Sequence, residues 1–129
     1  MSRHPGVGDA MPDIALELPD GGSVKPSEFA GRKLVMFFYP KDDTPGCTTE
    51  NKDFSALAGE FEKAGVALLG ISKDPPAKHQ KFMARHGLTA PLASDAQAGG
   101  LSDALGLWTE KQNYGRTYMG MERTTYLVA

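Results

Sequence analysis

Residues 34–47 read Leu34-Val-Met-Phe-Phe-Tyr-Pro-Lys-Asp-Asp-Thr-Pro-Gly-Cys47, an unbroken apolar run followed by a polar loop. An apolar run of strand length without alternation predicts a central strand that is buried on both faces. Beyond the loop, these residues recur near the helical period: Cys47, Phe54, Leu57, Ala58 and Phe61. The stretch therefore predicts a strand, a loop and a helix, with Cys47 in the first helical turn.

Short apolar segments separated by turn residues continue along the rest of the chain. Strands are predicted at 14–18, 66–71, 92–95 and 124–128, and helical segments at 26–31, 76–86 and 101–105. Asp20-Gly21-Gly22 predicts a hairpin turn after the first strand. Strands that alternate with helices indicate an α/β layer structure with a central sheet and helices on both faces. We expect one domain over residues 1–129, with a loose leader over 1–12.

Composition excludes several classes of protein. The formal net charge is −2, from 14 basic and 16 acidic residues, and Lys and Arg form no cluster, which argues against a nucleic-acid partner. The apolar run at 34–39 is too short to span a membrane, and the polar N-terminus lacks a signal-peptide core. We therefore expect a cytoplasmic protein. The single cysteine fits a reducing compartment.

Chemistry is predicted at the junction between the strand and the helix. Thr44 suits the N-cap and Pro45 the first helical position, so Cys47 lies where free amide N–H groups and the helix dipole favour a thiolate. Thr44 and Cys47 are three residues apart, so the hydroxyl can bond the thiolate or an incoming oxygen. From these residues alone, Cys47 also fits a buried structural cysteine.

The segment from Pro40 to Cys47 matches the peroxiredoxin signature of a Pro, three residues, a Thr, two residues and a Cys. Its longer form, from Phe38 to Thr48, resembles peroxiredoxin Q, also called bacterioferritin comigratory protein. The resemblance covers nearly the whole chain, including 65–72, 92–95, 105–108 and 115–127. It implies a thioredoxin-like fold: a central mixed β-sheet flanked by helices, with an N-terminal β-hairpin. Relative to that fold, the sequence is expected to lack the usual C-terminal strand and helix.

The same resemblance implies roles for individual residues. Cys47 would be the peroxidatic thiolate, and Thr44 would hydrogen-bond the bound peroxide. Pro40 would shape the pocket and shield the sulfur from water. Arg123 would favour the thiolate and orient the peroxide through its fixed positive charge. The implied reaction reduces hydrogen peroxide or an alkyl hydroperoxide through a cysteine sulfenic acid, and it requires no metal or organic cofactor.

This sequence departs from the family at the resolving cysteine. Many members carry it five residues after the peroxidatic one, where this chain has Lys52, and others in the helix predicted at 101–105, where this chain has none. An external thiol must then reduce the sulfenic acid: a thioredoxin, a glutaredoxin, a small thiol or a second copy of the chain. A monomer is expected, and a dimer through the sheet edge stays open.

The remaining polar residues near the site receive structural interpretations. Asp42 and Asp43 are expected to be solvated loop residues, and Glu50 to complement the helix dipole in the first turn. His79 and His86 are expected on an exposed helix face, without ligand spacing to Cys47, so no metal site is predicted. Trp108 is expected to pack beside a helix end.

Three other functions compete with the peroxidase interpretation. A thioredoxin-like dithiol carrier needs Cys-x-x-Cys, whereas this chain reads Cys47-Thr-Thr-Glu50. A peroxide sensor would use the same cysteine as a switch and pass its oxidation to one protein partner. An inactive homologue would lack part of the machinery, whereas Pro40, Thr44, Cys47 and Arg123 are all present.

Overall fold

A computed structural model describes residues 11–29, 32–42, 44–95, 100–113 and 115–128. Most of the predicted leader over 1–12 therefore lies outside the described residues, as does Asp43. The strands are β1 (Leu16–Glu17), β2 (Ser23–Val24), β3 (Lys33–Phe38), β4 (Val66–Ser72), β5 (Leu92–Ser94), β6 (Trp108–Asn113), β7 (Arg116–Met121) and β8 (Thr124–Val128). The helices are η1 (Pro26–Phe29, 3₁₀), α1 (Pro45–Lys63), α2 (Pro76–His86) and α3 (Leu101–Ala104).

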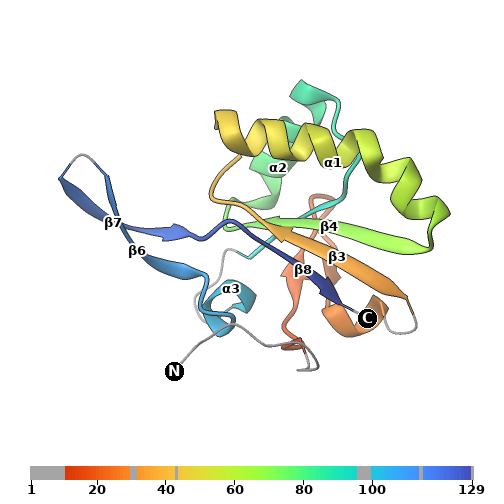
Figure 1. The fold of residues 1–129 in the computed structure, drawn as a ribbon, viewed down its shortest axis with the longest axis horizontal. Helices are drawn as coiled ribbons and strands as arrows, with labels where there is room; N and C mark the ends of the chain where they lie inside the picture. Colours follow the sequence, from red (N-terminus) through yellow and green to blue (C-terminus); the bar gives the residue numbers. More distant parts are fainter. Residues whose placement is uncertain (1–10, 30–31, 43, 96–99, 114, 129) are drawn as a thin grey trace.

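The main sheet has six strands in the order β2-β1-β5-β4-β3-β8. Strands β3, β4 and β5 run parallel, whereas β8 and β1 pair antiparallel to their neighbours. Helices α1 and α2 cover one face, and α3 and η1 lie on the other (Figure 1). This confirms the predicted α/β class with a mixed central sheet and an N-terminal β-hairpin.

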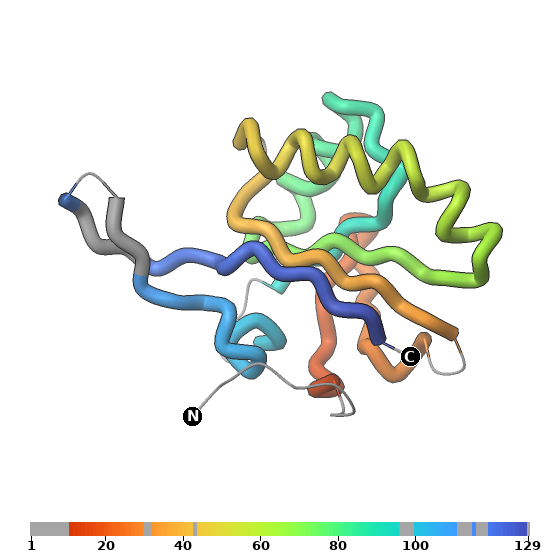
Figure 2. Tube along the Cα trace, viewed as in Figure 1, coloured from red at the N-terminus to blue at the C-terminus, as the bar shows by residue number. Residues whose placement is uncertain are grey.

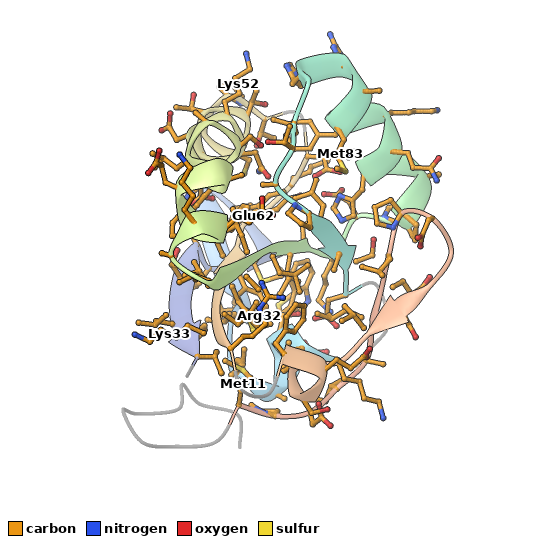
Figure 3. All side chains as sticks on the ribbon, turned by 90° about the vertical axis from the view of Figure 1, so that its right-hand side faces the viewer. Met11, Arg32, Lys33, Lys52, Glu62 and Met83 are labelled. Carbon is orange, nitrogen blue, oxygen red and sulfur yellow. The ribbon has the colours of Figure 1, made fainter. Side chains whose placement is uncertain are left out.

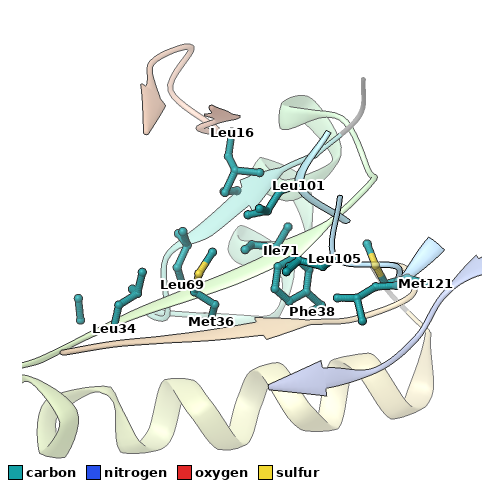
Figure 4. Packing of buried hydrophobic residues seen from close by; sticks show 12 residues of the cluster. Leu16, Leu34, Met36, Phe38, Leu69, Ile71, Leu101, Leu105 and Met121 are labelled. Atoms are coloured by element: carbon teal, nitrogen blue, oxygen red, sulfur yellow. The ribbon is translucent and has the colours of Figure 1, made fainter. Parts of the chain in front are cut away.

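Strand β3 lies between two cores, because successive side chains of the strand point to opposite faces of the sheet. Leu34, Met36 and Phe38 belong to the core under α3 (Figure 4). Phe37 belongs to the core beneath α1 and α2, together with Tyr39, which follows the strand. The unbroken apolar run thus reflects burial on both faces, as predicted.

Gly70 of β4 leaves room on the sheet for the ring of Phe37. It is the register partner of both Phe37 in β3 and Leu92 in β5. A Cβ at Gly70 would lie 2.5 Å from Cζ of Phe37 and 2.7 Å from Cδ2 of Leu92. The absent side chain therefore leaves the space that these two residues fill.

Helix ends follow the predicted signals. Thr44 is the N-cap of α1 with Pro45 as the first helical residue, and Gly87 ends α2 in the left-handed region at φ 60°. Figure 3 shows α1 and α2 side by side above the sheet, with Met83 on the side of α2 that faces α1. In the described part of the chain, no helix combines the length and the apolar character that a membrane span requires.

The hairpin formed by β6 and β7 was not predicted. These strands form a separate two-stranded antiparallel sheet that extends away from the main body (Figures 1 and 2). Met121 at the end of β7 is fully buried and reaches the core under α3. The hairpin then leads directly into Arg123 and β8.

Candidate active site

Cys47 is the third residue of α1, the helix that follows β3 in the chain. The chain leaves β3, passes through a short loop and enters α1 at Thr44 and Pro45. Amide groups of the first helical turn have no acceptor within the helix, and the dipole places positive charge there. The side chain is 1% exposed and packs in the core beneath α1 and α2. Both predicted features, burial and a position at the helix start, are therefore present.

Arg123 contacts the sulfur from the opposite end of the sequence. Its Nη2 donates to Sγ of Cys47 at 3.2 Å, and it precedes β8, which pairs with β3. Gly46 makes room for this approach, because a Cβ there would lie 3.3 Å from Nη2. Burial acts to lower the pKa of Arg123, but its bond and attraction to Cys47 and Glu50 raise it above the ordinary value. The guanidinium therefore stays charged beside the sulfur.

Glu50 holds the other arm of the same guanidinium. Its Oε1 accepts from Nη1 of Arg123 at 2.6 Å. Burial raises the pKa of Glu50, and the nearby Arg123 opposes that shift. The expectation that Glu50 complements the helix dipole in the first turn was wrong, because the first turn of α1 holds no acidic residue. The spacing of three from Cys47, which puts both on one helix side, was the available signal.

Thr44 occupies the predicted N-cap but does not bond the sulfur. Its hydroxyl donates to the carbonyl of Lys41 at 2.9 Å, and its own carbonyl accepts the first helical bond, from Thr48. Of the two partners predicted for this hydroxyl, the sulfur is therefore not bonded in this arrangement, and the incoming oxygen stays a prediction. Pro40 lies two residues after the end of β3 and is half-buried.

Two polar residues near the site are buried where exposure was expected. Asp42 is 2% exposed and His79 is fully buried, because the two side chains bond each other at 2.7 Å. The predictions of a solvated Asp42 and an exposed His79 were therefore wrong. Half-buried His86 packs its ring edge-on against Phe82. Asn51, also fully buried, donates to the carbonyl of Cys47 at 2.9 Å.

A surface hollow of about 460 Å³ opens beside Arg123. It is lined by Gly46, Thr49, Glu50, Asp53, Phe54, Leu57 and Arg123. Leu57 is 50% exposed in it, although the helical period had assigned this residue to the core. A hollow that combines the apolar Phe54 and Leu57 with charged residues, Arg123 among them, suits a small molecule that carries a polar head and an apolar tail.

Two further residues, Trp108 and Lys52, complete the comparison with the sequence expectations. Trp108 is half-buried, and the ammonium of Lys73 lies 5.1 Å from the centre of its ring. Lys52, at the position where a resolving cysteine was sought, is exposed on α1 and lines a separate hollow with His86. The structure therefore brings Cys47, Arg123 and Glu50 together at one site and leaves Trp108 and Lys52 outside it.

Comparison with known proteins yields consistent matches. Residues 7–129 match the sequence model of the AhpC/TSA family. Peroxiredoxin Bcp of Xanthomonas campestris pv. campestris is 44% identical over 117 residues, which make up 91% of this chain and 72% of that protein. Peroxiredoxin Bcp of Bacillus subtilis is 40% identical over 122 residues, covering 95% of this chain and 77% of that protein.

A solved structure of the bacterioferritin comigratory protein of Xanthomonas campestris superposes with a TM-score of 0.82 at 41% identity. The match covers 94% of this chain and 81% of that one, and the structure is described as giving insight into that protein's alkyl peroxide reduction activity. Fold and sequence therefore point to one family.

Proposed function

The chain belongs to the AhpC/TSA family and is a peroxiredoxin, and from that premise we propose that Cys47 is the peroxidatic residue of a one-cysteine thiol peroxidase. The observation that carries the proposal is the 3.2 Å contact between Nη2 of Arg123 and Sγ of Cys47 at the start of α1. A fixed cation and a helix N-terminus both favour the thiolate, which is the nucleophile.

The reaction needs little beyond these groups. The thiolate attacks one oxygen of ROOH, so that an S–O bond forms as the O–O bond breaks. The leaving oxygen takes a proton and departs as ROH, and Cys47 becomes a sulfenic acid. Negative charge grows on the leaving oxygen, and the guanidinium of Arg123 stabilises it.

Thr44 and Pro40 complete the proposed site. Because the Thr44 hydroxyl already donates to Lys41, its oxygen lone pairs are left to accept a hydrogen from the peroxide. Pro40 restricts the approach of water to the sulfur, in keeping with its half-buried position after β3. Each of these roles is distinct from that of Arg123, so they can be tested separately.

We propose both hydrogen peroxide and alkyl hydroperoxides as substrates. The hollow beside Arg123 offers Phe54 and Leu57 to an alkyl group, with the guanidinium at the polar end. The similar Xanthomonas campestris protein, described for alkyl peroxide reduction, supports the same substrate class. Hydrogen peroxide, having no alkyl group, would use only the polar end.

The reductant is proposed to be an external thiol. The chain has one cysteine and so forms no internal disulfide. A thioredoxin, a glutaredoxin or a small thiol would reduce the sulfenic acid of Cys47 and close the cycle. We further propose that the chain acts as one monomeric domain in the reducing cytoplasm, in antioxidant defence and redox homeostasis.

Stopped-flow oxidation of the reduced protein by hydrogen peroxide at neutral pH tests the proposal, with sulfenic acid trapping read by intact mass. Oxidation should be orders of magnitude faster than that of a free thiol. Arg123→Ala should slow it by about 100-fold or more, as expected for loss of a transition-state donor. Arg32→Ala is the matched control, since Arg32 lies just before the opposite end of β3. A rate like that of free cysteine would refute the proposal.

A further inference from the structure

Three fully buried polar side chains lie together beneath α2, apart from the contacts of Arg123. They are Tyr39, just after β3, Asp42, in the loop before α1, and His79, on α2. Their exposed fractions are 0%, 2% and 0%, respectively. The hydroxyl of Tyr39 donates to Oδ1 of Asp42 at 2.6 Å, and Nδ1 of His79 lies 2.7 Å from Oδ2. Both carboxylate oxygens of Asp42 are therefore bonded.

Both ring nitrogens of His79 face oxygen atoms. Nδ1 faces the Asp42 carboxyl group, and Nε2 faces the carbonyl of Ala93 in β5 at 3.1 Å. Both nitrogens thus lie within hydrogen-bond distance of a partner, as expected of a buried polar group, and the two contacts fix the orientation of the ring. Burial and the nearby Asp42 raise the pKa of Tyr39 above its usual range, which keeps the phenol a donor.

The backbone of Asp42 is held as well. Its N–H donates to Oδ2 of Asp74 at 2.7 Å, and that carboxylate oxygen also accepts from the hydroxyl of Ser72 at 2.8 Å. Asp74 in turn pairs with Lys78 one helical turn away at 3.1 Å. Main chain and side chain of Asp42 are thus fixed to β3, β4 and α2 together. The loop from Tyr39 to Thr44 has its anchor at this residue.

We propose that His79 and Tyr39 are positioning residues that act through Asp42 to hold Thr44 and Cys47 in register with Arg123. The inference rests on the proposed role of Cys47. Neither residue touches the peroxide in this assignment. Cys47 follows the loop that contains Asp42, whereas Arg123 directly precedes β8. The distance between the sulfur and the guanidinium therefore depends on the position at which the loop is held. Displacement of a reacting group by about 1 Å lowers a rate by about 100-fold.

Two substitutions of the same histidine separate positioning from packing. The amide nitrogen of asparagine takes the place of Nδ1, whereas that of glutamine takes the place of Nε2. His79→Asn therefore keeps a donor toward Asp42, and His79→Gln keeps one toward Ala93 while filling the space better. We expect His79→Gln to oxidise about 100-fold more slowly than the unmodified protein, and His79→Asn to stay within about 10-fold of it.

Alkylation by iodoacetamide is measured on the same samples, since it requires a thiolate but no aligned peroxide. Because Arg123 also favours the thiolate, positioning predicts some loss of alkylation in folded His79 variants and a larger loss of peroxide oxidation, which needs the aligned guanidinium as well. Equal losses in the Asn and Gln variants, or equal losses in oxidation and alkylation, would overturn the assignment. Circular dichroism and Tm show whether each variant folds.

Tyr39→Phe covers the case in which the histidine variants do not fold. It removes only the hydroxyl that bonds Asp42 and keeps the ring in the core. We expect oxidation to slow by about 10-fold and alkylation to slow less than oxidation. An oxidation rate equal to that of the unmodified protein would overturn the proposal. The unmodified protein, measured in the same series, tests the proposed function itself. If its oxidation rate equals that of a free thiol, the proposed role of Cys47 is wrong, whatever the variants show.

A spectroscopic readout is independent of peroxidase activity. The nitrogen-15 resonances of the His79 ring should shift in Asp42→Asn, because that variant changes the partner of Nδ1. Unshifted ring resonances in that variant would overturn the contact between the two side chains, whatever the reactivity of Cys47.

Discussion

The guanidinium of Arg123 divides its two arms between Cys47 and Glu50, with Nη2 at 3.2 Å from the sulfur and Nη1 at 2.6 Å from the carboxylate. Cys47 and Glu50 both belong to α1, whereas Arg123 belongs to the segment before β8. The arginine is thus held by the same helix that carries the cysteine. An ion pair this exposed contributes at most about 1 kcal/mol to stability, so its main effect is on the orientation of the guanidinium.

Removal of Glu50 should therefore impair the reaction more than the fold. Glu50→Ala leaves Arg123 without its second anchor, and we expect oxidation of Cys47 to slow by about 10-fold while Tm changes little. Glu60→Ala, on an exposed part of α1, removes a carboxylate without touching Arg123 and should oxidise normally. Stopped-flow kinetics measure both. Faster oxidation in Glu50→Ala would show that its negative charge outweighs its anchoring.

Substitutions of Thr44 distinguish its hydroxyl from its shape. Thr44→Ser keeps the bond to the Lys41 carbonyl, whereas Thr44→Val keeps the volume and loses that bond. We expect Thr44→Ser to oxidise within a few-fold of the unmodified protein, and Thr44→Val at least about 100-fold more slowly, as for loss of an oriented polar group. Equal rates in the two variants would assign Thr44 a purely structural role.

Gly70→Ala should destabilise the fold strongly. The new methyl would meet Phe37 and Leu92 at 2.5 and 2.7 Å, so the core beneath α1 and α2 has to shift. Overpacking of this kind costs about 1–3 kcal/mol. Gly59→Ala is the matched control, because no atom lies within 4 Å of its Cβ position, and a helix interior prefers Ala by about 1 kcal/mol. Urea unfolding measures both, and an unaffected Gly70→Ala would contradict the close packing.

The loop anchor should lose stability in acid through Asp74. Burial acts to raise its pKa, but hydrogen bonds from Asp42, Ser72 and Lys78 outweigh burial and place the pKa below its ordinary value. A lowered pKa in the folded state stabilises the fold above the unfolded value of about 3.9, and this stabilisation is lost as pH falls through the folded value.

The Tm difference between the unmodified protein and Asp74→Asn should therefore stay constant from pH 7 to about pH 5 and shrink below about pH 4. Thermal unfolding followed by circular dichroism measures it. Lys78→Ala, which removes one of the partners, should reduce the pH-dependent part. A difference that does not change with pH would mean that the charge of Asp74 is irrelevant to the loop.

Most of the fold could be predicted because local signals agree with it. The apolar run ending at Tyr39, the cap at Thr44 and Gly87 after α2 each act within a few residues. The β6–β7 hairpin gave no comparable signal, because β6 reads WTEKQN, in which a single aromatic residue precedes polar ones. β6 is a strand because it pairs with β7, and its own residue pattern does not predict it.

The site was less predictable because its contacts are distant in sequence. Arg123 lies 76 residues from Cys47, and only the family resemblance indicated that they meet. His79 was assigned to an exposed helix face, and its neighbours in sequence, Lys78, Gln80 and Lys81, are polar. A helical signal was available: Phe82, three residues on, shares its side of α2 and is fully buried. The carboxyl group of Asp42, which bonds its ring, lies in the loop before α1, and no pattern local to α2 reports it.

The separation of Cys47 and Arg123 in sequence also bears on how the proposed site is assembled. Synthesis proceeds from the N-terminus, so α1 and its thiol are complete before β8 exists to pair with β3. The contact between Sγ of Cys47 and Nη2 of Arg123 depends on that long-range pairing, which forms more slowly than the local contacts of a helix. The proposed peroxidatic site is therefore complete only once β8 has joined the sheet.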